Sequence, residues 1–346
     1  MNPMSSTETV NTCLASARRG VEWLLAQQTA AGNWRQLETE VYDAYYKGSW
    51  ALASAGHLDA AHRLLTHVQR TFLAPDGDLE PRLSPLHTVI ARHYCSAYAV
   101  LGAQKLDRYE IAAPAMRFLL SQQDPDHGGF YSVKTQPGER LRSDSMSTSM
   151  AGVACLAAGQ TGAAVRAGDC LLRMVEMQPA PEERFYTTLD AEGRLITEFA
   201  PEMTEWRVVQ TGEPKQRWFA VGLPFVFAIL LRDATGEERF ARLADELFAF
   251  QSRGADPWDV PSSGKAGWGC SILYRNTGEL KYREIALRVA RQIMGYQTPA
   301  GYFLIGPSPA GPSEPAVFAP FIYDVTAEFV LWLTLISANV LTRDGA

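Results

Sequence analysis

The sequence has little that would cross-link the chain or bind a metal. Its five cysteines are scattered through 346 residues, and none forms a CxxC pair. This argues against a disulfide framework and against a cysteine-based metal cluster. The first 20 residues lack an apolar run behind a basic start, so we expect no secretory signal. Together these absences predict reduced thiols, no metal, no cofactor and a cytoplasmic location.

Positive charge is also scarce. The chain carries 32 Lys and Arg against 38 Asp and Glu, a net charge of −6, which disfavours nucleic acid or anionic lipid as the main partner. The last apolar run, residues 329–341, is short for a membrane span and follows Asp324 and Glu328 in the same helical stretch. We therefore expect no nucleic-acid partner and no stable membrane insertion. The sequence leaves the oligomeric state open.

Long β-type alternation is nearly absent, and helical periodicity dominates. A Gln, three residues, a Gly, one residue and an aromatic recur after helical stretches, as QTAAGNW at 28–34 and QTPAGYF at 297–303. The stretch FLLSQQDPDHGGFYS at 118–132 contains a copy that is one residue longer. Although it holds two acids and a His, we interpret it as a structural repeat junction rather than a site. Degenerate copies follow Gln178 and Gln251, and LAPDGDL stands at 73–79.

A second pattern alternates with the first: one apolar helix ends and another begins around a Gly, as expected for an αα-hairpin. Six alternating helix pairs predict an all-α fold, a single closed (α/α)6 toroid spanning residues 1–346. The outer helices are expected near 9–28, 58–72, 108–123, 161–178, 237–251 and 280–297. The inner helices are expected near 39–55, 86–103, 144–159, 216–234, 265–277 and 319–341.

The segments QTAAGNW and QTPAGYF resemble the QxxxGxW/F repeat of terpenoid cyclases of the squalene–hopene type. The alternating helix pairs resemble the α/α toroid that these cyclases share with protein prenyltransferase β subunits. The likeness covers nearly the whole chain and implies this fold, whereas toroids also host sugar epimerases, glycosidases and lyases.

The sequence departs from both families at their functional motifs. The acidic DxDD motif of protonating cyclases is absent, and the nearest strings, at 124–127 and 189–193, fall in loops. No Asp, Cys and His set matches the prenyltransferase zinc site, and Cys270 is expected to be a packed small hydrophobe. The resemblance therefore predicts a member of the toroid superfamily and leaves its activity open.

Long loops precede the expected inner helices, at 29–39, 74–86, 124–143, 179–215, 252–264 and 298–318, whereas the opposite connections are tight Gly turns. This asymmetry predicts that the mouth of a central cavity lies at the long-loop end. Within the longest loop, residues 184–199 are typical of a β-hairpin around 190–193. Such a hairpin could close over the cavity as a lid or lie on the surface.

Acids within otherwise apolar inner helices are the first candidates for catalysis, because a buried carboxylate is costly without a partner or a role. Asp43 lies four residues before Lys47, so a helix ion pair is an alternative interpretation. Asp144 stands at a helix start, where an N-cap is an alternative. Asp324 and Glu328 share one face of the last inner helix, with Glu328 deeper in the barrel.

Aromatic and basic residues at the starts of the inner helices complete the candidate site. Aromatic rings facing the lumen would stabilise a developing carbocation or stack on a sugar ring. Two His fall on the second inner helix, and two Lys could hold an anionic group. The proposed catalytic residues are Asp43, Asp144, Asp324 and His93; the substrate-binding residues are Tyr42, Tyr46, Lys47, Trp50, His87, Trp218, Lys265, Trp268, Tyr323 and Glu328.

Three functions remain open. The first is a cyclase or isomerase that acts on a small hydrophobic, terpenoid- or polyketide-like metabolite by metal-independent general acid–base catalysis. The second is a carbohydrate-active toroid, a sugar epimerase or a glycoside hydrolase or lyase, that uses inner-helix carboxylates; two inner-helix His are few for a His-based epimerase. The third is a non-catalytic binding module in which the inner acids are paired structurally.

Overall fold

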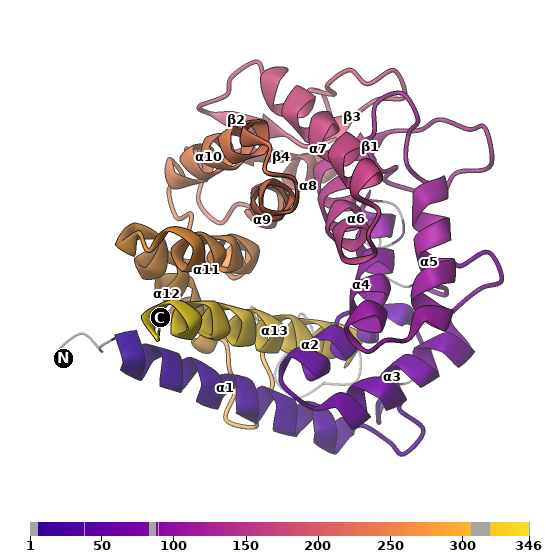
Figure 1. Ribbon diagram of the computed structural model, residues 1–346, viewed down its shortest axis with the longest axis vertical. Helices are drawn as coiled ribbons and strands as arrows, with labels where there is room; N and C mark the ends of the chain where they lie inside the picture. The colour runs from indigo at the N-terminus through magenta and orange to yellow at the C-terminus, as the bar shows by residue number, and fades with distance from the viewer. Residues whose placement is uncertain (1–5, 38, 83–87, 89, 306–318, 346) are drawn as a thin grey trace.

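Twelve helices form two concentric rings (Figure 1). The computed structural model describes residues 6–37, 39–82, 88, 90–305 and 319–345. The inner helices are α2 (Gly48–Ser54), α4 (Arg92–Lys105), α6 (Ser145–Ala157), α9 (Phe219–Thr235), α11 (Gly264–Thr277) and α13 (Ala319–Asp344). The outer helices are α1 (Ser6–Gln27), α3 (Leu58–Thr71), α5 (Tyr109–Ser121), α7 (Thr161–Glu176), α10 (Glu238–Ser252) and α12 (Leu280–Met294). Each inner helix packs on the next, and α13 packs on α2, so the ring closes. The predicted (α/α)6 toroid is confirmed.

The two kinds of helix differ in which faces are apolar. In the outer helix α3, buried residues such as Ala61, Leu65 and Val68 recur every three or four positions, so one face packs inward and the other meets solvent. In the inner helix α6, residues 145–155 are all buried. Small residues allow this close packing: a Cβ on Gly152 would lie 2.3 Å from the ring of Phe227 on α9. The Ser and Thr of α6 are buried together with its apolar residues, so no face of the helix meets solvent over residues 145–155.

The recurring Gln joins neighbouring outer helices. The Gln123 side-chain amide donates to the carbonyl of Gly128 at 2.8 Å in its own junction and to that of Ala163 on α7 at 2.9 Å. Arg166 of α7 donates back to Gln123 Oε1 at 2.7 Å. Gly128 adopts φ +77°, and a Cβ there would lie 2.3 Å from the Arg166 carbonyl, so only Gly fits.

The same arrangement occurs at two other junctions and closes the outer ring. Gln28 donates to the carbonyl of Ala60 on α3 at 3.0 Å. Gln297, at the end of the chain's last outer helix, donates to the carbonyl of Ser16 on α1 at 2.9 Å and to that of Gly301 at 2.8 Å. The first and last outer helices are therefore joined by the same kind of Gln-to-carbonyl hydrogen bond that joins α5 to α7.

The stretch at 118–132 is a structural junction, as predicted. Asp124 is buried and its carboxylate accepts hydrogen bonds from the backbone amides of Asp126 and His127 and from the hydroxyl of Tyr131. Arg140 also pairs with it at 3.2 Å. The Asp124 carboxylate therefore stabilises the conformation of its own loop.

Two inner helices differ from the prediction at their N-terminal ends. The segment expected as a helix from residue 39 holds a short 3-10 helix, η1 (Tyr42–Ala44), before α2 begins at Gly48. The second inner helix begins at Arg92 rather than 86, and residues 83–87 and 89 lie outside the described part of the chain. Helical periodicity locates the apolar core of a helix better than its first turn.

The loop at 179–215 holds four short elements: β2 (Arg184–Tyr186), β3 (Thr188–Leu189), α8 (Pro201–Arg207) and β4 (Val208–Gln210). The predicted tight turn at 190–193 is present, but the hairpin is shorter than expected. Only a single bridge, between Leu189 and Leu195, joins the two sides of that turn. The strands pair with other segments instead: β3 with β1 (Ser143–Asp144) and β2 with β4, both antiparallel. A Cβ on Gly193 would lie 2.7 Å from the ring of His127, so the turn packs on the neighbouring repeat junction.

Arg207 anchors this long loop. Its guanidinium is buried and donates to the carbonyl of Ile90, just before α4, at 3.0 Å and to the hydroxyl of Thr188 at 3.3 Å. Burial lowers its pKa, against the opposing charge of Asp144. Through Arg207 and the pairing of β3 with β1, the loop is tied to the N-terminal ends of α4 and α6.

The last helix is longer than the apolar run suggested. Residues 320–344 are long and apolar enough to span a membrane by length and composition, with a mean hydropathy of 1.5, so the sequence-based estimate of a short run is wrong. Two thirds of that apolar window is buried inside the protein, where α13 packs against α1, α2 and α11. A core helix meets the same criterion as a membrane span.

We expect Gln123→Ala to lower the free energy of unfolding by about 3 kcal/mol, because two buried carbonyls lose their donor and Arg166 loses its acceptor. Urea unfolding measures the change. The matched control is Gln136→Ala, at an exposed position in the following loop, which should change stability by less than about 0.5 kcal/mol. Equal effects of the two substitutions would show that the junction bonds do not hold the ring.

Candidate functional site

Four charged side chains meet among the inner helices. Lys47 at the N-cap of α2 lies 2.7 Å from Asp324 Oδ1 on α13 and is ion-paired with Glu328 Oε2. Lys265 on α11 is ion-paired with Glu328 Oε1. The side chains of Lys47 and Lys265 are 2% and 6% exposed, and that of Glu328 is 13% exposed. One carboxylate therefore bridges two ammonium groups inside the ring.

Aromatic rings surround the two ammonium groups. Lys47 Nζ lies 4.7 Å from the ring centroid of Tyr46 and 5.8 Å from that of Tyr94 on α4. Lys265 Nζ lies 5.6 Å from the ring of Phe219 at the start of α9 and 5.8 Å from that of Tyr94. These distances are those of cation–π contacts. Four inner helices and the segment before α2 thus contribute to one cluster.

Three tryptophans form one wall of this cluster. Trp268 on α11 stacks on Trp332 of α13, with centroids 5.2 Å apart and planes at 21°. Trp50 meets both rings edge-on. Trp332 Nε1 donates to Glu328 Oε1 at 3.0 Å. Asp324, Glu328 and Trp332 are spaced by four residues, which places them along one face of α13.

The charges set one another's protonation. Burial would raise the pKa of Glu328, but Lys265 and Lys47 outweigh it and hold that pKa well below its usual range. Burial would lower the pKa of Lys47, but Asp324 and Glu328 raise it. For Lys265, burial dominates and lowers the pKa below 10.5, because it shares Glu328 with a second cation. Of the two lysines, Lys265 therefore gives up its proton more readily.

The structure brings together seven of the residues predicted to form the site: Tyr46, Lys47, Trp50, Lys265, Trp268, Asp324 and Glu328. The other residues that the structure describes have local contacts of their own.

Asp144 is the N-cap of α6, where its carboxylate accepts from the amide of Ser147 at 2.8 Å. Asp43 is buried in η1. The Tyr42 hydroxyl donates to the Cys95 carbonyl at 3.2 Å.

Three further candidates lie in other contacts. His93 is fully buried, hydrogen-bonded to the Val133 carbonyl, and burial followed by the charge of Arg82 lowers its pKa to about 3, so the ring is neutral. Trp218 packs against the outer helix α10 through Phe250. His87 lies outside the described residues.

Tyr323 faces the loop after α1. It stacks on Trp34 with centroids 5.1 Å apart, and its hydroxyl donates to the Arg35 carbonyl at 2.7 Å. Its neighbour in sequence, Asp324, faces Lys47 instead. Adjacent helical residues point in directions about 100° apart, and here only the second reaches the charge cluster.

Sequence reasoning missed Tyr94, Tyr98 and Trp332. Tyr98 meets Tyr46 edge-on at 5.3 Å and lies one helical turn after Tyr94. The signal was present in the spacing: Tyr94 and Tyr98, and Glu328 and Trp332, are pairs separated by four residues. Such stripes mark one face of a helix, but spacing does not say whether that face meets the lumen or an outer helix.

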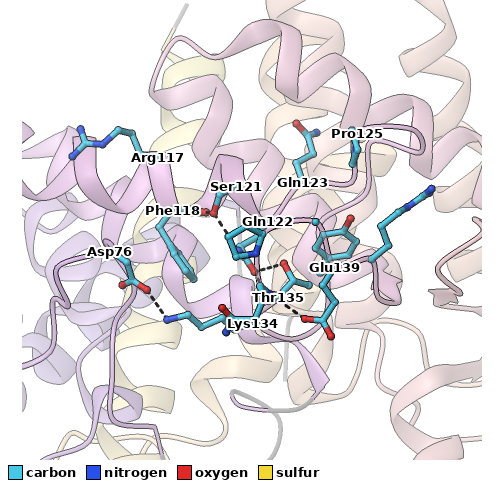
Figure 2. A pocket seen from close by; sticks show the side chains of 15 residues that line it. Asp76, Arg117, Phe118, Ser121, Gln122, Gln123, Pro125, Lys134, Thr135 and Glu139 are labelled. Carbon is cyan, nitrogen blue, oxygen red and sulfur yellow. Dashed lines mark hydrogen bonds and ion pairs between the residues drawn. The ribbon is translucent and has the colours of Figure 1, made fainter.

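A separate pocket of about 730 Å³ lies between the end of α5 and the loop at 131–140 (Figure 2). Its polar side chains are engaged with one another: Lys134 pairs with Asp76 at 2.7 Å, and Gln122 accepts from the amide of Thr135 at 2.8 Å. None of the clustered inner-helix charges lines it. We take the inner cluster as the candidate site because it concentrates buried, mutually dependent charges.

No protein-family model matches the chain, and no curated protein matches it. Solved structures are similar in fold. One is the GH76 α-mannanase of Bacteroides thetaiotaomicron, with a TM-score of 0.67 and 12% identity over 99% of this chain and 100% of that one. Another is a D-mannose isomerase, with a TM-score of 0.69 and 9% identity over 96% of this chain and 99% of that one. A third is the type II terpene cyclase MstE from Scytonema, with a TM-score of 0.61 and 12% identity over 96% of this chain and 99% of that one. At these identities the likeness shows the α/α-toroid fold alone.

We expect Glu328→Gln to destabilise the fold by about 3–5 kcal/mol, because it leaves the Lys265 ammonium buried without a carboxylate partner. Adding Lys265→Met should recover about 2 kcal/mol of that loss, since the unpaired charge is then gone. A double-mutant cycle from urea unfolding measures this coupling.

The control is a double-mutant cycle on the exposed ion pair between Arg288 Nη2 and Asp259 Oδ2, which lie 2.5 Å apart. The coupling energy of this pair should stay below about 1 kcal/mol. If the costs of the two substitutions at Glu328 and Lys265 simply add, the proposed interdependence of the buried charges is wrong.

Proposed function

We propose that the chain is an enzyme that isomerises or epimerises a small sugar or related hydroxy-carbonyl compound at the inner charge cluster. The observation that carries this proposal is the set of two lysines and two carboxylates, buried together between aromatic rings. Sugar recognition uses this combination, because flat apolar rings stack on the sugar faces while charged groups bind hydroxyl and carbonyl oxygens.

The cluster suits proton transfer next to a carbonyl group. In the proposed step, the neutral amine of Lys265 takes the proton from the carbon beside the substrate carbonyl. The electron pair of that C–H bond moves to the carbonyl oxygen, giving an enediolate. The Lys47 ammonium, held by Asp324 and Glu328, stabilises the new oxyanion. For isomerisation, the hydroxyl proton on the neighbouring oxygen passes to the new oxyanion, and the Lys265 ammonium returns its proton to the former carbonyl carbon, which leaves the carbonyl on the neighbouring carbon. For epimerisation, the enediolate turns its other face to Lys265, which returns the proton to the same carbon as the original carbonyl re-forms.

The same geometry argues against glycoside hydrolysis. That reaction needs one protonated carboxylic acid to protonate the leaving group. The two lysines keep Glu328 ionised, and Asp324 is ion-paired with Lys47. Glu328 therefore cannot serve as that proton donor near neutral pH.

A cyclase acting on a hydrophobic metabolite is the second candidate, favoured by the aromatic wall and by the fold it shares with a terpene cyclase. Two buried ammonium groups oppose it. They already face the rings of Tyr46, Tyr94 and Phe219, the groups that would stabilise a carbocation. A substrate carbocation there would meet two like charges. The likeness to a D-mannose isomerase supports sugar chemistry in this fold.

The test is proton exchange in D2O. We expect at least one of a panel of aldoses and ketoses to lose the NMR signal of the proton beside its carbonyl carbon when incubated with the protein. Lys265→Met should reduce this exchange at least 100-fold, as expected for loss of a general base. Lys281→Met, an exposed lysine on α12, should leave it unchanged. Absence of exchange with every sugar, together with thermal stabilisation by isoprenoid hydrophobes, would favour the cyclase instead.

The rate of exchange should rise with pH, because only neutral Lys265 accepts the proton. Burial lowers the pKa of this lysine, so the rising limb is expected to have its midpoint clearly below 10.5, where an ordinary lysine titrates. A pH–rate profile from pH 5 to 10.5 measures it. A flat profile, or a limb centred at or above 10.5, would rule out Lys265 as the base.

A further inference from the structure

Glu328 Oε1 accepts hydrogen bonds from two different donors. One is the Lys265 ammonium, and the other is the Trp332 indole N–H at 3.0 Å. The second carboxylate oxygen, Oε2, accepts from Lys47. The oxygen that binds the candidate base is therefore shared with a neutral donor, an indole N–H that does not titrate in the accessible pH range.

The indole of Trp332 is held in place on every side. Its side chain is fully buried, stacked on Trp268 and met edge-on by Trp50 at 6.2 Å. The backbone of Gly264 closes the remaining side: a Cβ there would lie 2.7 Å from Trp332 Cδ1. A ring packed in this way cannot turn its N–H away from the carboxylate.

We propose that Trp332 is a positioning residue: its N–H fixes Glu328 against Lys265 and thereby controls how easily Lys265 releases its proton. A hydrogen bond to a carboxylate withdraws negative charge from the oxygen that receives it. With this donor present, Glu328 holds the Lys265 proton less tightly. The catalytic meaning of this control rests on the proposed function, but the effect on Lys265 does not.

Trp268 provides the matched comparison. It belongs to the same stack, but among the contacts of the described residues it donates no hydrogen bond to Glu328, whereas the Trp332 ring also lies 5.7 Å from Lys265 Nζ. Phenylalanine at either position keeps an aromatic ring in the wall. Only the change at Trp332 removes a donor from the carboxylate.

The experiment is an NMR titration of Lys265 in protein with labelled lysine side chains, with no substrate present, the signal being assigned from Lys265→Met. Trp332→Phe should raise the titration midpoint of Lys265 by about one pH unit, whereas Trp268→Phe should leave it within about 0.3 units of the unmutated protein. Where sugar exchange is measurable, its rising limb should shift upward by the same amount in Trp332→Phe.

A second variant guards against misfolding of the first. Gly264→Ala keeps the indole but displaces it, so it should shift the Lys265 midpoint in the same upward direction. If neither Trp332→Phe nor Gly264→Ala moves the midpoint, or if Trp268→Phe moves it equally, Trp332 only packs and the proposal is wrong. Because the titration needs no substrate, that failure is distinct from a failure of the proposed sugar chemistry.

Discussion

The sharing of one carboxylate by two buried ammonium groups is the interaction on which the candidate site depends. Glu328 compensates both Lys47 and Lys265, and Asp324 adds a second negative charge on the Lys47 side only. The cluster is therefore neutral overall but unequal within. The two carboxylates raise the pKa of Lys47, whereas burial lowers the pKa of Lys265. Both ammonium groups are buried among aromatic rings, where charges are screened less than at the surface.

The ring makes such a cluster attainable. Lys47 and Glu328 are 281 positions apart in sequence, and they meet because α13 closes the ring against α2. That closure is secured outside the inner ring by the bond from Gln297 to α1, the same junction that joins α5 to α7. Hydrogen bonds from the Gln side chains to backbone carbonyls of the outer helices thus hold the ring closed. The closed ring in turn brings the charges of the inner helices together.

Much of this could be predicted from the sequence, and the reasons for the rest are physical. Periodicity, the Gly turns and the Gln junctions define six helix pairs, because each is a local pattern. Local patterns also placed Asp324, Glu328, Lys47 and Lys265 among the candidates, but they could not pair them, since the pairing is made across the ring. From spacing alone, Asp144, His93 and Trp218 are as good candidates for the site as Lys265. In the structure these three make other contacts and do not join the charge cluster. Trp332 was missed because its role depends on a neighbouring carboxylate.

Proteins with a similar fold include a GH76 α-mannanase, a D-mannose isomerase and a type II terpene cyclase, so the fold alone does not decide the function of this chain. The most direct test is a crystal structure of the Lys265→Met variant with an aldose or ketose bound. Our account predicts the sugar among the inner helices, with its carbonyl oxygen in hydrogen-bonding distance of Lys47 and its ring against the aromatic wall. A sugar bound only in the pocket of Figure 2, with the inner helices unchanged, would contradict this prediction.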